Sequence, residues 1–275
     1  MTAQQLFIWR TMCRIRYFSE HCHQAIVDGR IKGFVYLSAG QEAAPAAIAW
    51  AFRDVRVNVF CQHRSHAVYI AFGGDVTKLR DELLGLPTGT TGGIGGDPCH
   101  AFQNDRVKML GHDGLVGSQV PIAVGMALAS GEQSIVFCGD AAVEEDYFFP
   151  AVGFAQTKQL PVIIVCEDND LSVITDVKTR RSWDAASVAA AYGLNSYVLT
   201  ADDPFSIVLR IEGWHRGFIQ IPCERMYRHV GAGMDRAMKH DRLEITRNQL
   251  FQTSPFDIAK IEAEAREEMR KLWQE

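Results

Sequence analysis

The sequence predicts an α/β fold with a doubly wound, mostly parallel sheet flanked by helices. Two apolar runs, residues 134–138 and 161–166, have the length and composition of buried strands, and a helix-like segment at 147–158 lies between them. A strand, a helix and a second strand form one crossover unit of a parallel sheet. Strands and helices alternate along the chain, as in sheets that are covered by helices on both faces.

The other elements follow from local patterns. We expect amphipathic or apolar helices, two further strands, a glycine-rich loop region and one charged connecting segment. The helices are expected at about 3–28, after Gly40, at 120–129, 185–192 and 256–274, the strands at 196–199 and 217–222, the glycine-rich loop at 85–118, and the charged segment at 230–250, as a loop or a partner contact.

Pro150 lies inside the helix-like segment between the two central strands. A proline in the middle of a helix costs about 3 kcal/mol, but a proline near the start costs little. We therefore expect this helix to begin near Pro150, with residues 144–149 as an irregular lead-in.

Composition excludes several classes of protein. The chain has 275 residues, of which 47% are apolar, and nothing in its composition marks a linker, so a single domain over 1–275 is expected. The net charge of −5, without a basic cluster, argues against nucleic acid. No apolar stretch is long enough to span a membrane, and the first residues are not a secretory signal. The seven cysteines show no zinc spacing, which favours a cytoplasmic protein with reduced thiols.

Polar residues follow both central strands. Asp140 comes directly after the first strand and Gly139, and Asn169 follows the second. Neighbouring parallel strands end at the same edge of a sheet, where such folds bind ligands. Carboxylate and amide oxygens, with the main-chain carbonyl of Leu171, suit Mg²⁺, which keeps other positions for phosphate oxygens and water. The alternative is that Asp140 caps a helix and Asn169 lies in a turn. The sequence thus predicts a magnesium–diphosphate site.

Five ordered motifs give the chain a resemblance to a known family. They are an opening block at 29–34 and 38–43, His-Arg-Ser-His at 63–66, a glycine-rich loop at 92–96, Gly-Leu-Val-Gly-Ser-Gln-Val-Pro at 114–121, and the segment 139–169, which begins Gly-Asp and ends with asparagine. The last is similar to the thiamine diphosphate motif. Over most of its length the chain resembles the α subunit of the two-subunit 2-oxo acid dehydrogenases, the E1 components.

The resemblance implies thiamine diphosphate and Mg²⁺ as cofactors, and the diphosphate-binding half of that fold. Arg64 and Arg225 would bind the diphosphate, because a planar guanidinium can bond two phosphate oxygens at once. The Gly114 carbonyl and Val116 would contact the aminopyrimidine. The alternatives are surface salt bridges for the arginines and a plain surface turn at 114–117. The other residues implied to contact the cofactor are His63, Gly139, Asp140, Ala141, Ala142 and Asn169.

Two histidines are implied to be catalytic. His229 follows Arg225 by four residues, which is the spacing of the family's arginine and histidine. A neutral imidazole there could donate to a developing alkoxide or carry a proton, near its ordinary pKa of about 6.5. His66 could assist from another loop. With nine histidines in the chain, accidental placement is the alternative for both.

The chain departs from the family pattern at four places. Ala141 stands where the metal motif usually has glycine, and Pro150 and Gly153 stand where a glutamate and an asparagine are common. In the glycine-rich region, Asp-Pro-Cys-His at 97–100 replaces Ser-Met-His with one extra residue. These changes bear on metal affinity and on the geometry of the loop.

The resemblance implies half of an active site. In this family the glutamate that activates thiamine comes from a second domain, and 275 residues are too few for both. A separate β-type subunit would supply it, in an α2β2 assembly. The expected function is decarboxylation of a small 2-oxo acid and transfer of the acyl group, to lipoamide on a lipoyl-bearing E2 partner. The alternatives are a subunit of a carboligase or split transketolase, with an aldehyde, ketone or sugar as acceptor, and a non-catalytic regulatory subunit.

Overall fold

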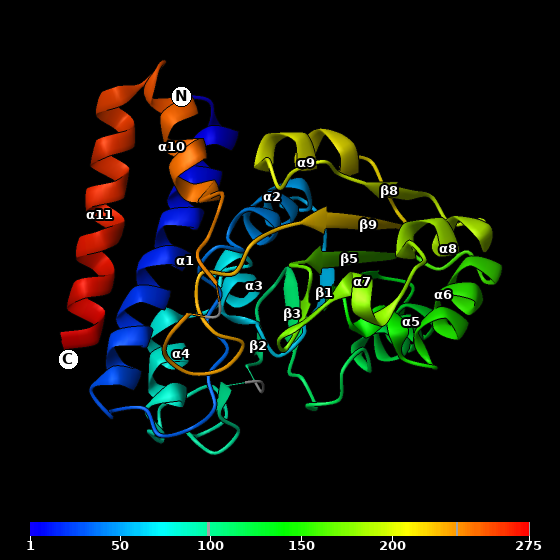
Figure 1. The fold of residues 1–275 in the computed structure, drawn as a ribbon, viewed down its shortest axis with the longest axis horizontal. Coiled ribbons are helices and arrows are strands. Elements are labelled where there is room, and N and C mark those ends of the chain that lie inside the picture. Colours follow the sequence, from blue (N-terminus) through cyan, green and yellow to red (C-terminus); the bar gives the residue numbers. More distant parts are fainter. Residues whose placement is uncertain (98–99, 235, 275) are drawn as a thin grey trace.

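A computed structural model describes residues 1–97, 100–234 and 236–274. Pro98 and Cys99, which belong to the segment 97–100 that differs from the family pattern, therefore lie outside the described residues. A seven-stranded sheet runs through the molecule in the order β2-β3-β1-β4-β5-β9-β8 (Figure 1). Only β2 pairs antiparallel with its neighbour. The strands are β1 (Val57–Phe60), β2 (Phe102–Gln103), β3 (Val107–Leu110), β4 (Gln133–Gly139), β5 (Val162–Asp168), β8 (Ser196–Val198) and β9 (Gly217–Pro222). The prediction of a doubly wound, mostly parallel sheet is confirmed.

Helices cover both faces of the sheet. Successive side chains of each strand point to opposite faces, so apolar residues form one core on each side of the sheet. Ile135, Ile163 and Ile219 point into the larger core, while Val136 and Ile164 enter the smaller one. The larger core is covered by α1 (Ala3–Val27), α2 (Ala43–Ala51), α3 (His66–Ala71), α4 (Val76–Leu83) and α9 (Pro204–Ile211), and the smaller by α5 (Gln119–Ser130), α6 (Phe148–Thr157) and α8 (Ala185–Ala191).

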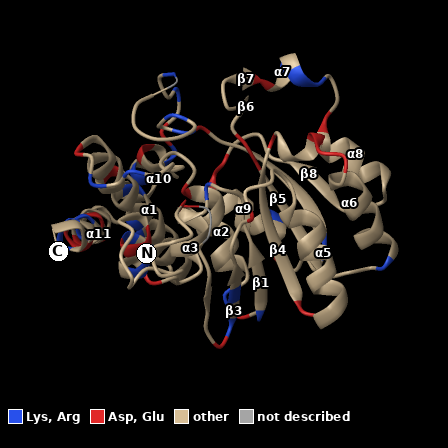
Figure 2. Ribbon diagram, turned by 90° about the horizontal axis from the view of Figure 1, so that it is seen from below, with Lys and Arg blue, Asp and Glu red and all other residues tan. Residues whose placement is uncertain are grey.

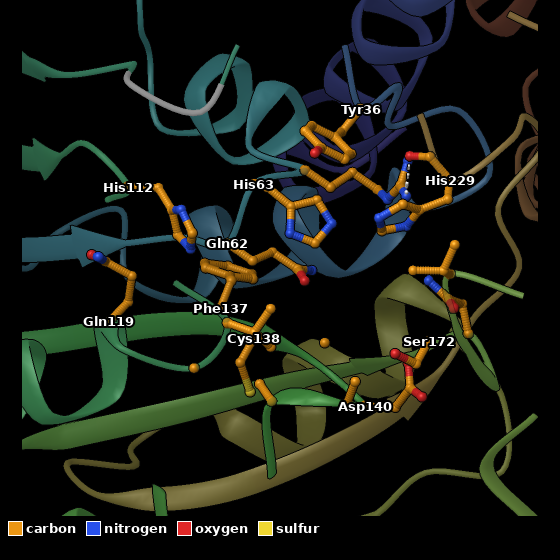
Figure 3. A pocket seen from close by; sticks show the side chains of 18 of the residues that line it. Tyr36, Gln62, His63, His112, Gln119, Phe137, Cys138, Asp140, Ser172 and His229 are labelled. Carbon is orange, nitrogen blue, oxygen red and sulfur yellow. Dashed lines mark hydrogen bonds between the residues drawn. The ribbon is translucent and has the colours of Figure 1, made fainter. Parts of the chain in front are cut away.

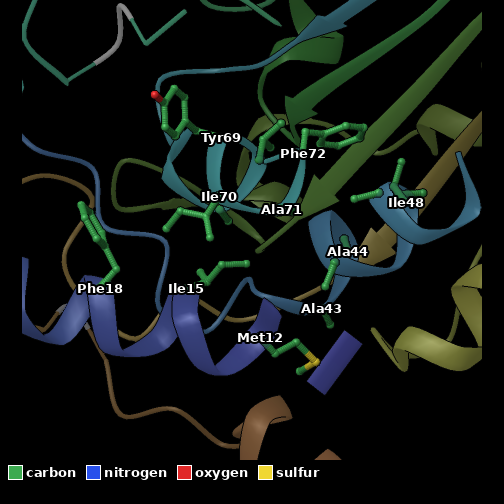
Figure 4. Close-up of a cluster of buried hydrophobic side chains, with 14 of the residues drawn as sticks. Met12, Ile15, Phe18, Ala43, Ala44, Ile48, Tyr69, Ile70, Ala71 and Phe72 are labelled. Carbon is green, nitrogen blue, oxygen red and sulfur yellow. The ribbon is translucent and has the colours of Figure 1, made fainter. Parts of the chain in front are cut away.

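The first helix organises the larger core. Met12, Ile15 and Phe18 project from α1 toward small residues of α2 and the apolar face of α3 (Figure 4). On its other side α1 packs along α11 (Pro255–Gln274), with α10 (Arg242–Phe251) beside them (Figure 1). Acidic and basic residues are interspersed on α11 (Figure 2), where Arg270 and Lys271 pair with Glu267. Both long helices agree with the predicted ranges to within a residue or two.

Two expectations for connecting segments were wrong. The region 85–118 is not all loop, since it holds β2 and β3, and part of the charged segment 230–250 is the helix α10. The helix of the crossover unit begins at Phe148, near Pro150 as expected, and the irregular lead-in, which includes a 3₁₀ turn (Ala142–Glu144), ends two residues earlier than predicted. Pro150 is tolerated because amide hydrogens in the first turn have no intrahelical acceptor.

A small hairpin stands beside the sheet edge that carries Asp140 and Asn169. It consists of β6 (Leu171–Ser172) and β7 (Thr175–Asp176), and it leads into the single-turn helix α7 (Val177–Arg180). Asp170 and Val173, both in this segment, have positive φ angles of 63° and 53°. No helix in the described ranges is long and apolar enough to cross a membrane.

Candidate active site

A cavity of about 190 Å³ lies at the carboxyl ends of the central strands (Figure 3). Its walls include residues that follow β1, β4 and β5. The order of the strands reverses at β1, because β3 pairs on one side of it and β4 on the other. Such a switch point leaves a crevice in which doubly wound sheets bind ligands.

Twelve of the thirteen residues predicted for the site line this cavity. They are His63, Arg64, Gly114, Val116, Gly139, Asp140, Ala141, Ala142, Asn169, Leu171, Arg225 and His229. His66 does not line it: its side chain is fully buried and its Nε2 lies 2.5 Å from a carboxylate oxygen of Asp97. The structure therefore gives no support to a catalytic role for His66.

The three predicted metal ligands all line the cavity. Asp140 is buried and does not cap a helix; the guanidinium of Arg180 donates to its carboxylate. The amide oxygen of Asn169 accepts from the main-chain N–H of Leu171 at 3.2 Å, so the alternative of a turn is also correct, and its amide nitrogen donates to Gln41 at 3.1 Å. One carboxylate, one amide and one carbonyl form the oxygen donor set that Mg²⁺ prefers.

Two basic residues, one at the end of α7 and one directly after it, form hydrogen bonds with Asp140 and Glu144. Arg180 and Arg181 both bond the carboxylate of Glu144, at 2.5 and 2.7 Å, and Arg181 also donates to the main-chain carbonyl of Asp140 at 2.6 Å. No sequence pattern indicated these contacts. They mean that a cation that binds Asp140 must compete with Arg180.

Removal of Arg180 is expected to strengthen metal binding. In Arg180→Ala the carboxylate of Asp140 no longer has a competing cationic partner, so the apparent affinity for Mg²⁺ with thiamine diphosphate should rise about 10-fold, or about 1.4 kcal/mol. Calorimetric titration of Mg²⁺ measures this. Lys178→Ala, in the same helix but exposed, is the control. Weaker binding in Arg180→Ala would mean that Arg180 contacts the cofactor instead.

Metal binding should also depend on pH. Burial and the neighbouring Asp168 raise the pKa of Asp140 from 3.8 to about 6, although Arg180 opposes the shift. Mg²⁺ needs the ionised carboxylate, so the proton competes at higher pH than it would at an exposed aspartate. We expect a constant affinity above about pH 7 and a fall approaching tenfold per unit well below pH 6. Titrations from pH 5 to 8 check this; an affinity constant over that range would contradict the assignment.

The cavity also has a strongly basic part. Arg64 and Arg225 are buried at 3% and 6% exposure, so the surface salt-bridge alternative is wrong for both. Arg64 donates to the carbonyls of Leu37, at 2.5 Å, and of His229, at 3.2 Å, and Arg225 donates to Val173. Burial, together with the charge of Arg225, lowers the pKa of Arg64 to about 10. Two buried guanidiniums that repel each other fit an anion such as a diphosphate.

Aromatic rings cluster next to these arginines. The ring of His63 lies 4.4 Å from that of Tyr36 and 5.2 Å from that of His229, with His112 at 6.4 Å (Figure 3). Burial and the charge of Arg64 lower the pKa of His63 to about 2, so this imidazole is neutral. Burial also lowers the pKa of His112, whose Nδ1 accepts from the Gly114 N–H at 2.7 Å, which leaves the proton on Nε2.

Several lining residues were not predicted. They include Tyr36, Gln62, His112, Gln119 and Ser172. Gln62 directly precedes the recognised segment 63–66, and His112 precedes the turn at Gly114, so proximity to a motif was an available signal for both. Tyr36 lies in a loop between two motifs, and no local pattern marks it.

Comparison with known proteins agrees with this geometry. The profile of the dehydrogenase E1 component family matches residues 10–210. The pyruvate dehydrogenase E1 component subunit alpha of Zymomonas mobilis is 28% identical over 97% of this chain and 82% of its own length. The alpha subunit of acetoin:2,6-dichlorophenolindophenol oxidoreductase of Cupriavidus necator is 34% identical over 74% of this chain and 62% of its own length.

Solved structures show the same fold. A transketolase variant from Pichia stipitis matches all of the chain with a TM-score of 0.62 and 17% identity, and a transketolase from Leishmania mexicana matches 99% with a TM-score of 0.59 and 14% identity. The chain spans 45% and 47% of those two proteins. With the family profile matching most of the chain, and with α subunits among its relatives, the protein belongs to the dehydrogenase E1 component family, as an α-type subunit.

Proposed function

We propose that this chain is the diphosphate-binding half of a thiamine diphosphate- and magnesium-dependent enzyme that decarboxylates a 2-oxo acid and transfers the acyl group. One observation carries the proposal: a single cavity at the switch point of the sheet combines oxygen ligands for a hard cation, two buried arginines and a group of imidazoles. Each part suits a different portion of that cofactor and its reaction. The retained site also argues against a purely regulatory subunit.

The residues of the cavity divide into binding roles. Asp140, Asn169 and the carbonyl of Leu171 would hold Mg²⁺, and Arg64 and Arg225 would neutralise the diphosphate. Gly139, Ala141 and Ala142 lie along the same wall, where small side chains let the cofactor approach the main chain. Gly114 and Val116, on the turn before α5, would contact the aminopyrimidine, while His63 lines the basic part of the cavity.

Bound thiamine diphosphate supplies a nucleophilic carbon and accepts the electron pair that remains when CO₂ leaves the 2-oxo acid. The chain's own task at this step is to move or hold protons near the substrate oxygen. His229 is the proposed donor, because its ring lies in the cavity beside His63 and its main chain is held by Arg64. His63 stays neutral and serves as a hydrogen-bonding wall. His66 takes no part.

Activity is proposed to require a β-type subunit. Among the described residues, the cavity is lined by no glutamate, which supports a β-type partner as the source of the group that activates the thiamine ring. We infer an α2β2 assembly. The six cysteines described in the structure are free thiols, which supports a reducing compartment such as the cytoplasm.

The isolated chain is therefore expected to lack turnover with any 2-oxo acid. Co-expression with the β-type gene product should restore decarboxylation and give a complex that contains both chains. Release of CO₂ from labelled 2-oxo acids and size-exclusion chromatography with light scattering measure the two properties. Robust decarboxylation by the chain alone would show that the activating acid lies within it.

The acyl acceptor is proposed to be lipoamide on an E2 partner, since α subunits of pyruvate dehydrogenase are among the relatives. The name of the Cupriavidus necator relative makes acetoin a second donor to assay. Transfer to lipoamide, to an artificial oxidant or to an aldehyde by the assembled complex separates a dehydrogenase from a carboligase.

A further inference from the structure

A second group of chemically versatile side chains lies buried outside the cavity. His66 and His100 have no exposed surface, and Asp97 is 2% exposed. Each of the three residues offers one atom that could bind a metal ion, and these three atoms lie within 4.8 Å of one another. The rings of His66 and His100 are 5.3 Å apart between centroids. None of the three lines the candidate active site.

Hydrogen bonds within the described chain do not satisfy this cluster. Asp97 bonds His66 Nε2 at 2.5 Å with one oxygen and accepts the N–H of Tyr36 at 3.0 Å with the other. His66 Nδ1 and His100 Nε2 are buried without a partner among the residues described. His100 Nδ1 has only a long contact of 3.4 Å with Thr90. Buried ring nitrogens without a partner are costly and need an explanation.

We propose that His66, Asp97 and His100 form a site for a divalent transition metal ion of the zinc class. Imidazole nitrogen and carboxylate oxygen are ligands that Zn²⁺ accepts readily, whereas Mg²⁺ prefers oxygen alone. In a tetrahedral zinc site, with bonds of about 2.0–2.1 Å, ligand atoms are about 3.3 Å apart. The present separations, from 2.5 Å to at most 4.8 Å, lie on either side of that value. When His66 binds the metal through Nε2, the ring keeps its proton on Nδ1, the Asp97 carboxylate binds as the anion, and a water molecule takes the fourth position.

The three residues connect two loops with the start of a helix. Asp97 and His100 belong to one short segment, 97–100, which brings a carboxylate and an imidazole close to His66. His66 begins α3, two residues after Arg64, and Asp97 holds the main chain of Tyr36, which lines the cavity. A metal ion here would tie the end of the glycine-rich loop to the wall of the cofactor cavity. Its role is structural and separate from the proposed Mg²⁺ site.

Zinc binding by the full-length chain tests the proposal. Metal-free protein is titrated with Zn²⁺ by calorimetry and elemental analysis, with Mg²⁺ held saturating so that Asp140 does not contribute. We expect about one tightly bound zinc per chain and a Tm increase of about 5–10 °C when free zinc is 100 times its Kd. His100→Gln should lose both effects, and His215→Ala, which removes an exposed histidine, should keep both. Absence of zinc binding, or equal binding in His100→Gln, would overturn the site and leave a hydrogen-bonded cluster.

A measurement on the unmodified protein covers the case in which His100→Gln fails to fold. Crystals of the wild-type chain grown with Zn²⁺ should give an anomalous peak at the zinc absorption edge between His66, Asp97 and His100. Co²⁺ substitution should give visible d–d bands that excess Zn²⁺ removes and Mg²⁺ does not. A zinc-saturated crystal with no peak at this cluster would refute the proposal without any variant.

Discussion

Asp140→Ala should abolish magnesium-dependent binding of thiamine diphosphate, with a loss of affinity of at least about 100-fold, or about 2.8 kcal/mol. Asp140 is the only anionic member of the predicted ligand set, because Asn169 and Leu171 offer a neutral amide and a neutral carbonyl. The substitution also leaves the positive charge of Arg180, which then pairs with Glu144 alone, beside the metal position. Calorimetric titration of thiamine diphosphate, with saturating Mg²⁺ and with a chelator, measures the effect.

A matched control separates loss of the ligand from loss of negative charge. Asp146→Ala removes an exposed carboxylate six residues further along the same segment, and its affinity should stay within about twofold of the wild type, because exposed charges contribute little. Circular dichroism before titration establishes that both variants are folded. If Asp140→Ala bound the cofactor as tightly as Asp146→Ala, the metal assignment would be wrong.

The parts of the fold that could be predicted are those in which a long periodic pattern decides the structure. α1, α11 and the central strands β4, β5 and β9 agree with expectation because each buries a continuous apolar face. β1 was not identified, since its four residues, Val-Asn-Val-Phe, are too few for a pattern and include a polar side chain. The hairpin of β6 and β7 has two residues in each strand and depends on tertiary contacts.

The candidate site was predicted where its chemistry lies in contiguous motifs. Asp140 and Asn169 could be placed on one edge of the sheet because crossover units have a fixed hand and parallel strands end together. The contact of Arg180 with Asp140 joins positions 40 residues apart and has no sequence signature. His66 is the predicted site residue that does not line the cavity: it follows Arg64 by two positions, but it begins α3 and its side chain is fully buried.

His229→Ala in the assembled complex should lower kcat by about 10²–10⁴-fold while thiamine diphosphate affinity stays nearly unchanged. The imidazole lies in the cavity beside the rings of Tyr36 and His63. The phosphates would be bound by other residues, the two arginines. Loss of a proton donor used at the transition state affects turnover more than binding. Steady-state kinetics at saturating cofactor, with calorimetry for the cofactor itself, separate the two parameters.

Arg225→Ala provides the complementary result. It removes positive charge from the proposed diphosphate site, so the thiamine diphosphate concentration needed for half-maximal activity should rise, by about 10- to 100-fold for one charge-assisted contact, while kcat at saturation changes less. Exposed His215→Ala should alter neither parameter. Near-normal turnover in His229→Ala would move the proton-handling role to another imidazole of the cavity. His112 would then be the candidate, because it lines the cavity and its Nδ1 accepts from Gly114, whereas His66 does not line it.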